Sequence, residues 1–238
     1  MHDIDQHIRN LGNVIFYARY VDDILIILAG FPNNQSISEY YKGLKNLFQN
    51  YGLEIKNNNP AEDKCKLIDF YNSTAKQQFT YLGYKITISK PKSEINAKFG
   101  MSDKKIAKIK QKIDASFAHF EQISAIDLKR AKRDLLDSLD LISGNFRLTK
   151  SKERVKAGLF FGNDLLTDYN DLDVLTSYLS SKSITPHGEV LKGRPDRTKY
   201  INSIKKKVDA INFQLRWHNR IMFKFNPQRI AEISEWLS

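Results

Sequence analysis

Apolar and polar residues alternate at the start of the chain in the manner of half-buried strands. The runs VIFYARYV and ILIIL flank Asp22-Asp23 within residues 14–28. Two such runs on either side of a short acidic segment predict a β-hairpin that is closed by a tight turn. Because successive side chains of a strand point to opposite sides, at most one of the two carboxylates fully faces a site unless the turn rotates both outward.

The pattern over the rest of the first hundred residues predicts a helix and further strands. Ser36 is placed to cap a helix that runs to about Asn50, and Gly52 marks its end. Short strands are expected at 53–56, 66–71, 78–84 and 85–89. Residues 1–90 are therefore predicted to be α+β, with an antiparallel sheet and a helix packed on it.

After Pro91 the apolar period lengthens from about two residues to about 3.6, which indicates helices. Gly100 and Ser102 supply a break and an N-cap, so we place a domain boundary between residues 1–100 and 101–238. Three apolar stripes predict an all-helical bundle, with a shorter helix near 172–179. The stripes are Ile106, Ile109, Ile113, Phe117 and Phe120; Leu128, Ala131, Leu135, Leu139 and Ile142; and Ile201, Ile204, Val208, Ile211 and Leu215.

Composition narrows the classes of function. Of 238 residues, 38 are Lys or Arg against 27 Asp or Glu, and the net charge of +11 favours a nucleic-acid partner, whose phosphates release counterions on binding. The single cysteine, Cys65, excludes an internal disulfide and favours a reducing compartment, so we expect a cytoplasmic protein. No apolar run is long enough to cross a bilayer, and we expect no membrane association.

The acidic hairpin and two later segments together resemble the reverse transcriptases. FYARYVDDILIIL is similar to the Tyr-x-Asp-Asp motif of that family, GLEIKNNNPAEDKCKLIDF to the motif that follows it, and FTYLGYKITI to the primer-grip motif. The three motifs stand in the family's order, and the basic segment after them resembles a thumb. The resemblance implies a partial polymerase palm followed by an all-helical, thumb-like bundle. A looser similarity points to bacterial reverse transcriptases linked to phage defence.

The resemblance also implies roles for individual residues. Asp22 and Asp23 become catalytic carboxylates and metal ligands, with Asp22 the principal one. Lys64 becomes the motif lysine near the incoming triphosphate, with Lys66 as the alternative. Mg²⁺ is the implied cofactor, since it needs only one or two protein carboxylates per ion, and two ions clamp an in-line phosphoryl transfer. The residues implied at the primer terminus and in the primer grip are Tyr20, Val21, Phe79, Tyr81, Leu82, Gly83 and Tyr84.

Basic side chains of the second part are candidates for contacts with nucleic-acid phosphates. They lie on the first predicted helix, after the second helix, and in the loop before the third. They are Lys104, Lys108, Arg147, Lys150, Lys152, Arg154, Arg194 and Arg197. For the two lysines of the first helix, a solvated helix face is an equally good explanation.

The part of the polymerase that precedes the acidic hairpin in the family is expected to be missing. Fingers, a further catalytic Asp on a neighbouring strand and a nucleotide-selecting loop have no counterpart before Val14, where Asp3 and Asp5 are poor substitutes. A truncated reading frame, a split gene with a separate polypeptide that carries the fingers and front palm, and a fragment all stay open.

The sequence therefore predicts, by family, an RNA-directed DNA polymerase that uses an RNA template, a DNA or RNA primer and deoxynucleoside triphosphates. This chain alone is expected to be inactive. Two other classes stay open. One is a non-catalytic nucleic-acid-binding or phage-defence scaffold protein with a polymerase-derived fold, which would account for the charge and the missing front half. The other is a helical module that docks a protein partner, for which binding should not weaken with salt.

Overall fold

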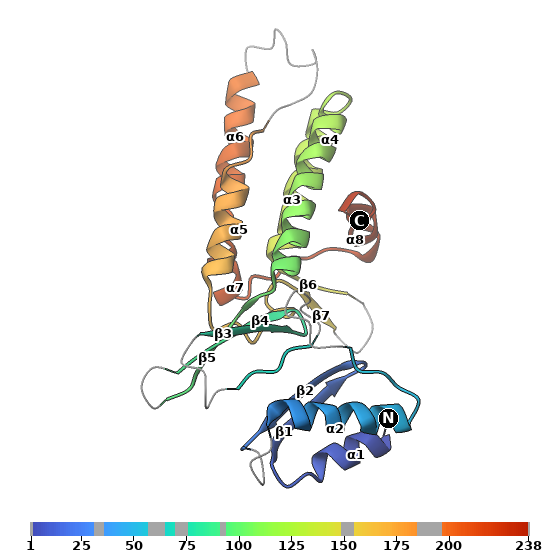
Figure 1. The fold of residues 1–238 in the computed structure, drawn as a ribbon. Coiled ribbons are helices and arrows are strands. Elements are labelled where there is room, and N and C mark those ends of the chain that lie inside the picture. Colours follow the sequence, from blue (N-terminus) through green and yellow to red (C-terminus); the bar gives the residue numbers. More distant parts are fainter. Residues whose placement is uncertain are drawn as a thin grey trace. The chain divides into compact units, whose positions relative to one another are not determined.

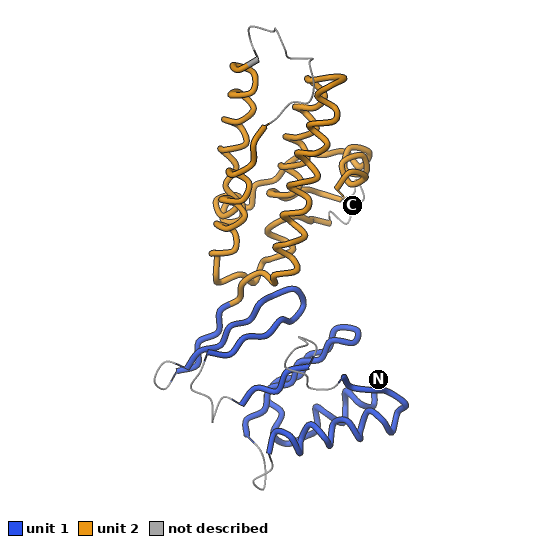
Figure 2. The backbone as a smooth tube through the Cα atoms, turned by 45° about the horizontal axis from the view of Figure 1, so that its top comes forward, with its two compact units in different colours: residues 1–98 blue, residues 99–238 orange. Residues whose placement is uncertain are grey.

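The computed structural model describes residues 2–30, 36–56, 65–69, 76–90, 94–148, 155–184 and 197–237. The described chain is mixed α+β, as the sequence predicts. It divides into two compact units, residues 1–98 and 99–238 (Figure 2).

The described part of unit 1 consists of helices and small antiparallel sheets. In chain order its elements are α1 (His2–Arg9), β1 (Val14–Tyr20), β2 (Asp23–Leu28), α2 (Ile37–Asn50), β3 (Gln77–Tyr81), β4 (Tyr84–Ser89) and the start of β5 (Asn96–Met101). Strand β1 pairs with β2, and β3, β4 and β5 form a three-stranded sheet in that order.

Helices α1 and α2 cover one face of the β1–β2 hairpin (Figure 1). Ile4, Ile8 and Phe48 are buried between the helices and the strands, and Tyr17 and Ile24 of the hairpin pack against them. In β2 the alternate residues Ile24 and Ile26 face this small core, as the pattern predicts, whereas in β1 an irregularity between Val14 and Phe16 separates Val14 from Tyr17 by three positions.

The helix expected after residue 36 is confirmed as α2. The Ser36 side chain accepts a hydrogen bond from the Glu39 N–H, and the Glu39 carboxylate accepts one from the Ser36 N–H, so the helix begins with a capping box. Gly52 follows the helix at a φ of 70°, a left-handed conformation that favours glycine.

The prediction of strands at 53–56 and 66–71 was wrong for those of their residues that the structure describes. Residues 53–56 and 66–69 form no strand. The Leu53 N–H instead donates to the Phe48 carbonyl at the end of α2, and Ile55 packs on the core of unit 1. A short apolar run becomes a strand only where a neighbour accepts its backbone hydrogen bonds, and no described strand pairs with either segment.

The hairpin expected within 78–89 forms, but its turn lies at Leu82-Gly83 and not between residues 84 and 85. Tyr81 pairs with Tyr84 across this two-residue turn, where Leu82 has a φ of 48° and Gly83 a φ of 78°. Two positive φ values are typical of a type I′ turn, whose twist matches that of the flanking strands.

Unit 2 is mainly helical in the residues that are described. Its elements are the end of β5, α3 (Asp103–Ser124), α4 (Leu128–Ser143), β6 (Asn145–Arg147), β7 (Lys156–Gly158), α5 (Asn170–Ser180), α6 (Arg197–Asp209), α7 (Phe213–His218) and α8 (Pro227–Leu237). Helices α3 and α4 lie side by side, with α5 against α3 and α6 against α4 (Figure 1). Ile113 and Phe120 of the first predicted stripe, and Leu135 and Leu139 of the second, are fully buried or nearly so.

The prediction of the third apolar stripe was wrong at its last residue, Leu215. Ile204, Val208 and Ile211 are buried, but Leu215 is 60% exposed. Asn212 begins a separate helix, α7, because its side chain accepts a hydrogen bond from the Leu215 N–H. The helical repeat restarts at this cap, so the positions of the stripe no longer share one face.

The prediction of an all-helical second part was also wrong, because β6 and β7 pair antiparallel between α4 and α5. The two strands approach closely at glycines: a Cβ atom on Gly158 would lie 2.3 Å from the Gly144 carbonyl oxygen. Asn145 is buried beside them. Its Oδ1 atom accepts from the Phe160 N–H at 2.8 Å, and its Nδ2 atom donates to the Ile221 carbonyl at 3.1 Å.

An ion-pair network attaches the C-terminal helix α8 to α4. Nη2 of Arg229 lies 2.7 Å from Oδ1 of Asp134 and 2.7 Å from Oδ2 of Asp137. Burial acts to raise the pKa of Asp134, but hydrogen bonds from Arg229 and His119 outweigh it and hold the pKa below its usual value. The His119 ring also stacks on Trp236 at 4.0 Å, so α3 contributes to the same contact.

Candidate active site

The acidic hairpin closes through a two-residue turn at Val21-Asp22, one residue earlier than the predicted turn. Tyr20 pairs with Asp23, which is the first residue of β2. Val21 has a φ of 57°, in the left-handed region that a β-branched residue rarely occupies. Such a conformation persists only where the surrounding structure enforces it.

Three hydrogen-bonded side chains connect this turn to α1, and we call them the Asp5–Arg19 brace: Asp5, Tyr17 and Arg19. Arg19 donates from Nη1 to the Val21 carbonyl at 2.9 Å, and from Nε and Nη2 to the two carboxylate oxygens of Asp5 at 2.8 and 2.7 Å. The Tyr17 hydroxyl donates to Oδ1 of Asp5 at 2.5 Å. The planar guanidinium thus connects α1 to the backbone of the turn in one fixed geometry.

The brace was only partly visible in the sequence. The sequence predicts that Asp5 is a poor substitute for a catalytic carboxylate, and the structure shows that it instead accepts hydrogen bonds from Arg19 and Tyr17. Alternation places Tyr17 and Arg19 on the same face of β1, two positions apart. Their meeting with an acid of α1 depends on the packing of that helix, which the pattern alone does not fix.

The brace leaves the acids of the turn exposed to solvent. Asp22 and Asp23 are both exposed, and Val21 between Tyr20 and Asp22 is 70% exposed. Two adjacent carboxylates offer the oxygen ligands that Mg²⁺ prefers, and an ion that keeps water and substrate phosphates needs no more from the protein. These residues therefore fit the predicted metal. Within the described ranges, no group of three or more His, Cys, Asp or Glu side chains is suited to a metal ion.

The predicted primer-grip residues lie on the β3–β4 hairpin. Phe79, Tyr81 and Tyr84 are partly buried, Leu82 is exposed in the turn, and Gly83 follows it. Burial raises the pKa of the Tyr81 hydroxyl, and the negative charge of Asp23 adds to this rise.

The face of the β1–β2 hairpin that α1 and α2 leave open carries exposed apolar side chains. Ile15, Phe16 and Ile27 are each about half exposed or more, and Phe16 pairs with Ile27 across the strands. In the described residues this sheet has two strands only, so both outer edges lack a strand neighbour. Apolar surface and free edges of this kind are typical of a sheet that another element completes.

The other predicted contact residues fall into described and undescribed groups. Lys104 and Lys108 are exposed on α3, and Arg147 is exposed at the end of β6. Lys66, the alternative motif lysine, donates from Nζ to the Gln78 carbonyl of β3 at 3.2 Å. Outside the described residues lie Lys64, Lys150, Lys152, Arg154 and Arg194, together with the side chain of Arg197.

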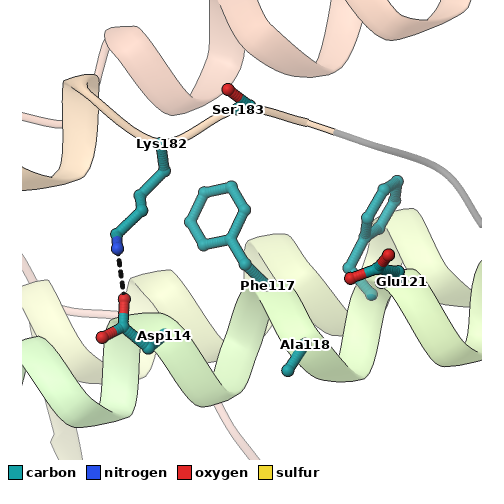
Figure 3. Close-up of a pocket in the computed structure, with 7 residues that line it drawn as sticks. Asp114, Phe117, Ala118, Glu121, Lys182 and Ser183 are labelled. Carbon is teal, nitrogen blue, oxygen red and sulfur yellow. Dashed lines mark ion pairs between the residues drawn. The ribbon is translucent and has the colours of Figure 1, made fainter.

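A pocket in unit 2 contains none of the predicted site residues. It has a volume of about 260 Å³ and lies between α3 and the segment that follows α5 (Figure 3). An ion pair between Asp114 and Lys182, 2.5 Å long, closes one side of it, and the Tyr178 hydroxyl also donates to Asp114. The lining residues are Asp114, Phe117, Ala118, Phe120, Glu121, Lys182 and Ser183.

Comparison with known protein families, with curated proteins and with solved structures found no match. Among the helices that the structure describes, none has both the length and the hydrophobicity needed to cross a membrane. The candidate site therefore rests on its own geometry and on the motifs in the sequence.

The Asp5–Arg19 brace predicts how the stability of unit 1 depends on pH. Hydrogen bonds from Arg19 lower the pKa of Asp5 to about 2, against burial and with further help from Tyr17. A carboxylate with a lowered pKa stabilises the fold above its unfolded pKa near 4, and this contribution is lost as the pH falls towards about 2. Asp5→Asn should therefore lower the melting temperature at neutral pH by a few degrees and flatten its fall in acid.

Thermal unfolding followed by circular dichroism between neutral pH and about pH 2 measures this effect. Asp3→Asn is the matched control, since Asp3 lies exposed on the same helix. Melting curves of Asp5→Asn that match those of Asp3→Asn at every pH would show that the brace does not stabilise unit 1.

Proposed function

We propose that this chain is a palm-and-thumb portion of an RNA-directed DNA polymerase, whose β1–β2 turn supplies carboxylates for metal-dependent nucleotidyl transfer. The observation that carries this proposal is the strained turn itself. Val21 has a φ of 57°, its carbonyl accepts a hydrogen bond from Arg19, and Asp22 beside it is exposed. A plain solvent turn does not require a β-branched residue in this conformation, whereas a turn that must hold a carboxylate in one position benefits from it.

Each element of the proposed site has a separate task. Asp22 and Asp23 hold Mg²⁺, which when bound neutralises charge on the transferring phosphoryl group. Arg19 donates to the Val21 carbonyl and so restrains the backbone next to Asp22. The β3–β4 turn positions the primer strand, and Gly83, which has no side chain, lets the sugar-phosphate chain approach closely.

The substrates follow from the same proposal. An RNA template, a DNA or RNA primer and deoxynucleoside triphosphates suit a chain with a net charge of +11, and Lys64 is the proposed contact to the triphosphate. The single cysteine is consistent with work in the reducing cytoplasm. By the looser similarity of its sequence, the proposed biological setting is phage defence.

The open face of the β1–β2 hairpin supports a partner that completes the palm. A two-metal site needs a further carboxylate on a neighbouring strand. Ile15, Phe16 and Ile27 give such a strand an apolar surface to pack on, and the edge of β1 or β2 gives it backbone hydrogen bonds. A separate polypeptide that carries the fingers and front palm is the proposed source of this strand.

Primer extension on an RNA template tests the proposal. The reaction contains a labelled primer, deoxynucleoside triphosphates and Mg²⁺, with this chain alone and with a separately expressed fingers-and-front-palm polypeptide. We expect synthesis only in the mixture, and none in either polypeptide alone. Salt-sensitive RNA binding without synthesis in the mixture would contradict the proposal.

That contrary result would favour a non-catalytic nucleic-acid-binding or phage-defence scaffold protein. Its supporting observation is the net charge of +11. RNA binding by such a protein should weaken with salt and should not change when Mg²⁺ is removed.

A further inference from the structure

Unit 2 contains a cluster of tilted and edge-on aromatic rings that includes two exposed basic residues, which we call the aromatic platform: Phe160, Tyr169, Trp217, His218 and Arg220. The Arg220 guanidinium lies over the Phe160 ring, 4.3 Å from its centre. Phe160 and Tyr169 each contact Trp217, with ring centres 5.1 and 5.2 Å apart, and Tyr169 contacts His218 at 4.6 Å.

The platform is only partly a core. Trp217 is buried, but Phe160 and Tyr169 are half-buried, and His218 and Arg220 are exposed. Rings that serve only to fill an interior are covered by other apolar groups. Here the cluster reaches solvent through two planar groups, the His218 imidazole and the Arg220 guanidinium.

The surrounding backbone is built to hold this arrangement. Arg220 has a φ of 49°, unusual for a residue with a side chain, and its N–H donates to the Trp217 carbonyl at the end of α7. Buried Asn145 connects two parts of the cluster, since it accepts from the Phe160 N–H and donates to the Ile221 carbonyl next to Arg220. The positions of Phe160 and Arg220 are therefore set by the β6–β7 region and not by the exposed surface alone.

We propose that the aromatic platform binds the bases of single-stranded nucleic acid. Aromatic rings and guanidinium planes stack on any base, and such contacts are the basis of sequence-tolerant single-strand binding. Lys156, which lies over the ring of Phe161 next to Phe160, supplies positive charge for the phosphates between stacked bases. The segment between β7 and α5, which carries Phe160 and Tyr169, also contains the carboxylates of Asp164 and Asp168.

A single strand fits this surface better than a duplex does. Bases in a duplex are stacked on one another, so their flat faces are not available to Arg220 or His218. A purely acidic partner would bind through the positive charges alone and would gain no affinity from the aromatic rings. The proposal does not depend on the function of the palm, because it concerns residues of unit 2 and binding without synthesis.

Fluorescence anisotropy with a labelled pyrimidine RNA of about twelve nucleotides tests the proposal on the full chain. Arg220→Lys keeps the positive charge but removes the planar guanidinium, and Phe160→Leu removes the aromatic ring under it. Each is expected to weaken single-strand binding by about tenfold, the loss of one stacked base. Phe160→Tyr keeps a ring and should bind like the unchanged protein.

The controls separate stacking from charge and from folding. Lys129→Gln removes an exposed charge of α4, and Tyr51→Leu removes an exposed ring of unit 1, and neither should change the affinity more than about twofold. A duplex of the same length should bind all variants alike. Unchanged single-strand affinity in both Arg220→Lys and Phe160→Leu would overturn the proposal, and so would an equal loss for the duplex.

Discussion

Asp22→Asn is expected to lower the rate of Mg²⁺-dependent primer extension by at least about a hundredfold in the mixture with a front-palm polypeptide. Asn has nearly the same shape as Asp and is accepted in turns, so the hairpin should keep its fold. The substitution removes the negative charge from the residue that lies in the turn itself. A neutral amide oxygen is a weaker ligand for Mg²⁺ than a carboxylate.

The structure supplies graded comparisons for this prediction. Asp23→Asn changes the first residue of β2, and we expect a smaller loss because Asp23 is the second acid of the proposed site. Glu54→Gln removes an exposed carboxylate elsewhere in unit 1 and should leave the rate unchanged. Single-turnover rates at saturating primer measure all three. Equal rates for Asp22→Asn and Glu54→Gln would mean that the turn takes no part in catalysis.

The sequence predicts best those elements whose signals lie within one short segment. The cap at Ser36, the apolar face of α2 and the glycine after it are local, and the helix forms as expected. The acidic hairpin is also local, since strong alternation on both sides of the acids sets its pairing. Its turn lies one residue earlier because Asp23 pairs with Tyr20 and so belongs to the strand.

The sequence predicts less well the features that depend on distant residues. The brace joins Asp5 of α1 to Arg19 of β1, and no periodicity in the sequence predicts that contact. Leu215 continues the apolar stripe in sequence, yet Asn212 starts a new helix and leaves it exposed. The strands β6 and β7 have three residues each, too few for alternation to appear, and tertiary contacts around Asn145 hold them together.

Gly158→Ala is expected to destabilise unit 2 by about 3 kcal/mol or more. Gly158 has a φ of 122°, a conformation that residues with a side chain rarely adopt. A Cβ atom there would lie 2.3 Å from the Gly144 carbonyl oxygen and 2.6 Å from Cα of Asn145. Both contacts are with backbone, so no side-chain rotation relieves them, and the β6–β7 pairing has to open.

Urea unfolding followed by far-ultraviolet circular dichroism measures this loss as a lower midpoint. Gly43→Ala is the matched control, because Gly43 lies in α2 and a Cβ atom on it would meet no other atom within 4 Å. Alanine there should stabilise the helix by up to about 1 kcal/mol. An unchanged midpoint in Gly158→Ala would contradict the tight approach of β6 and β7. Because Asn145 holds Phe160 and Ile221, the same substitution should also weaken single-strand binding under conditions where the protein is still folded.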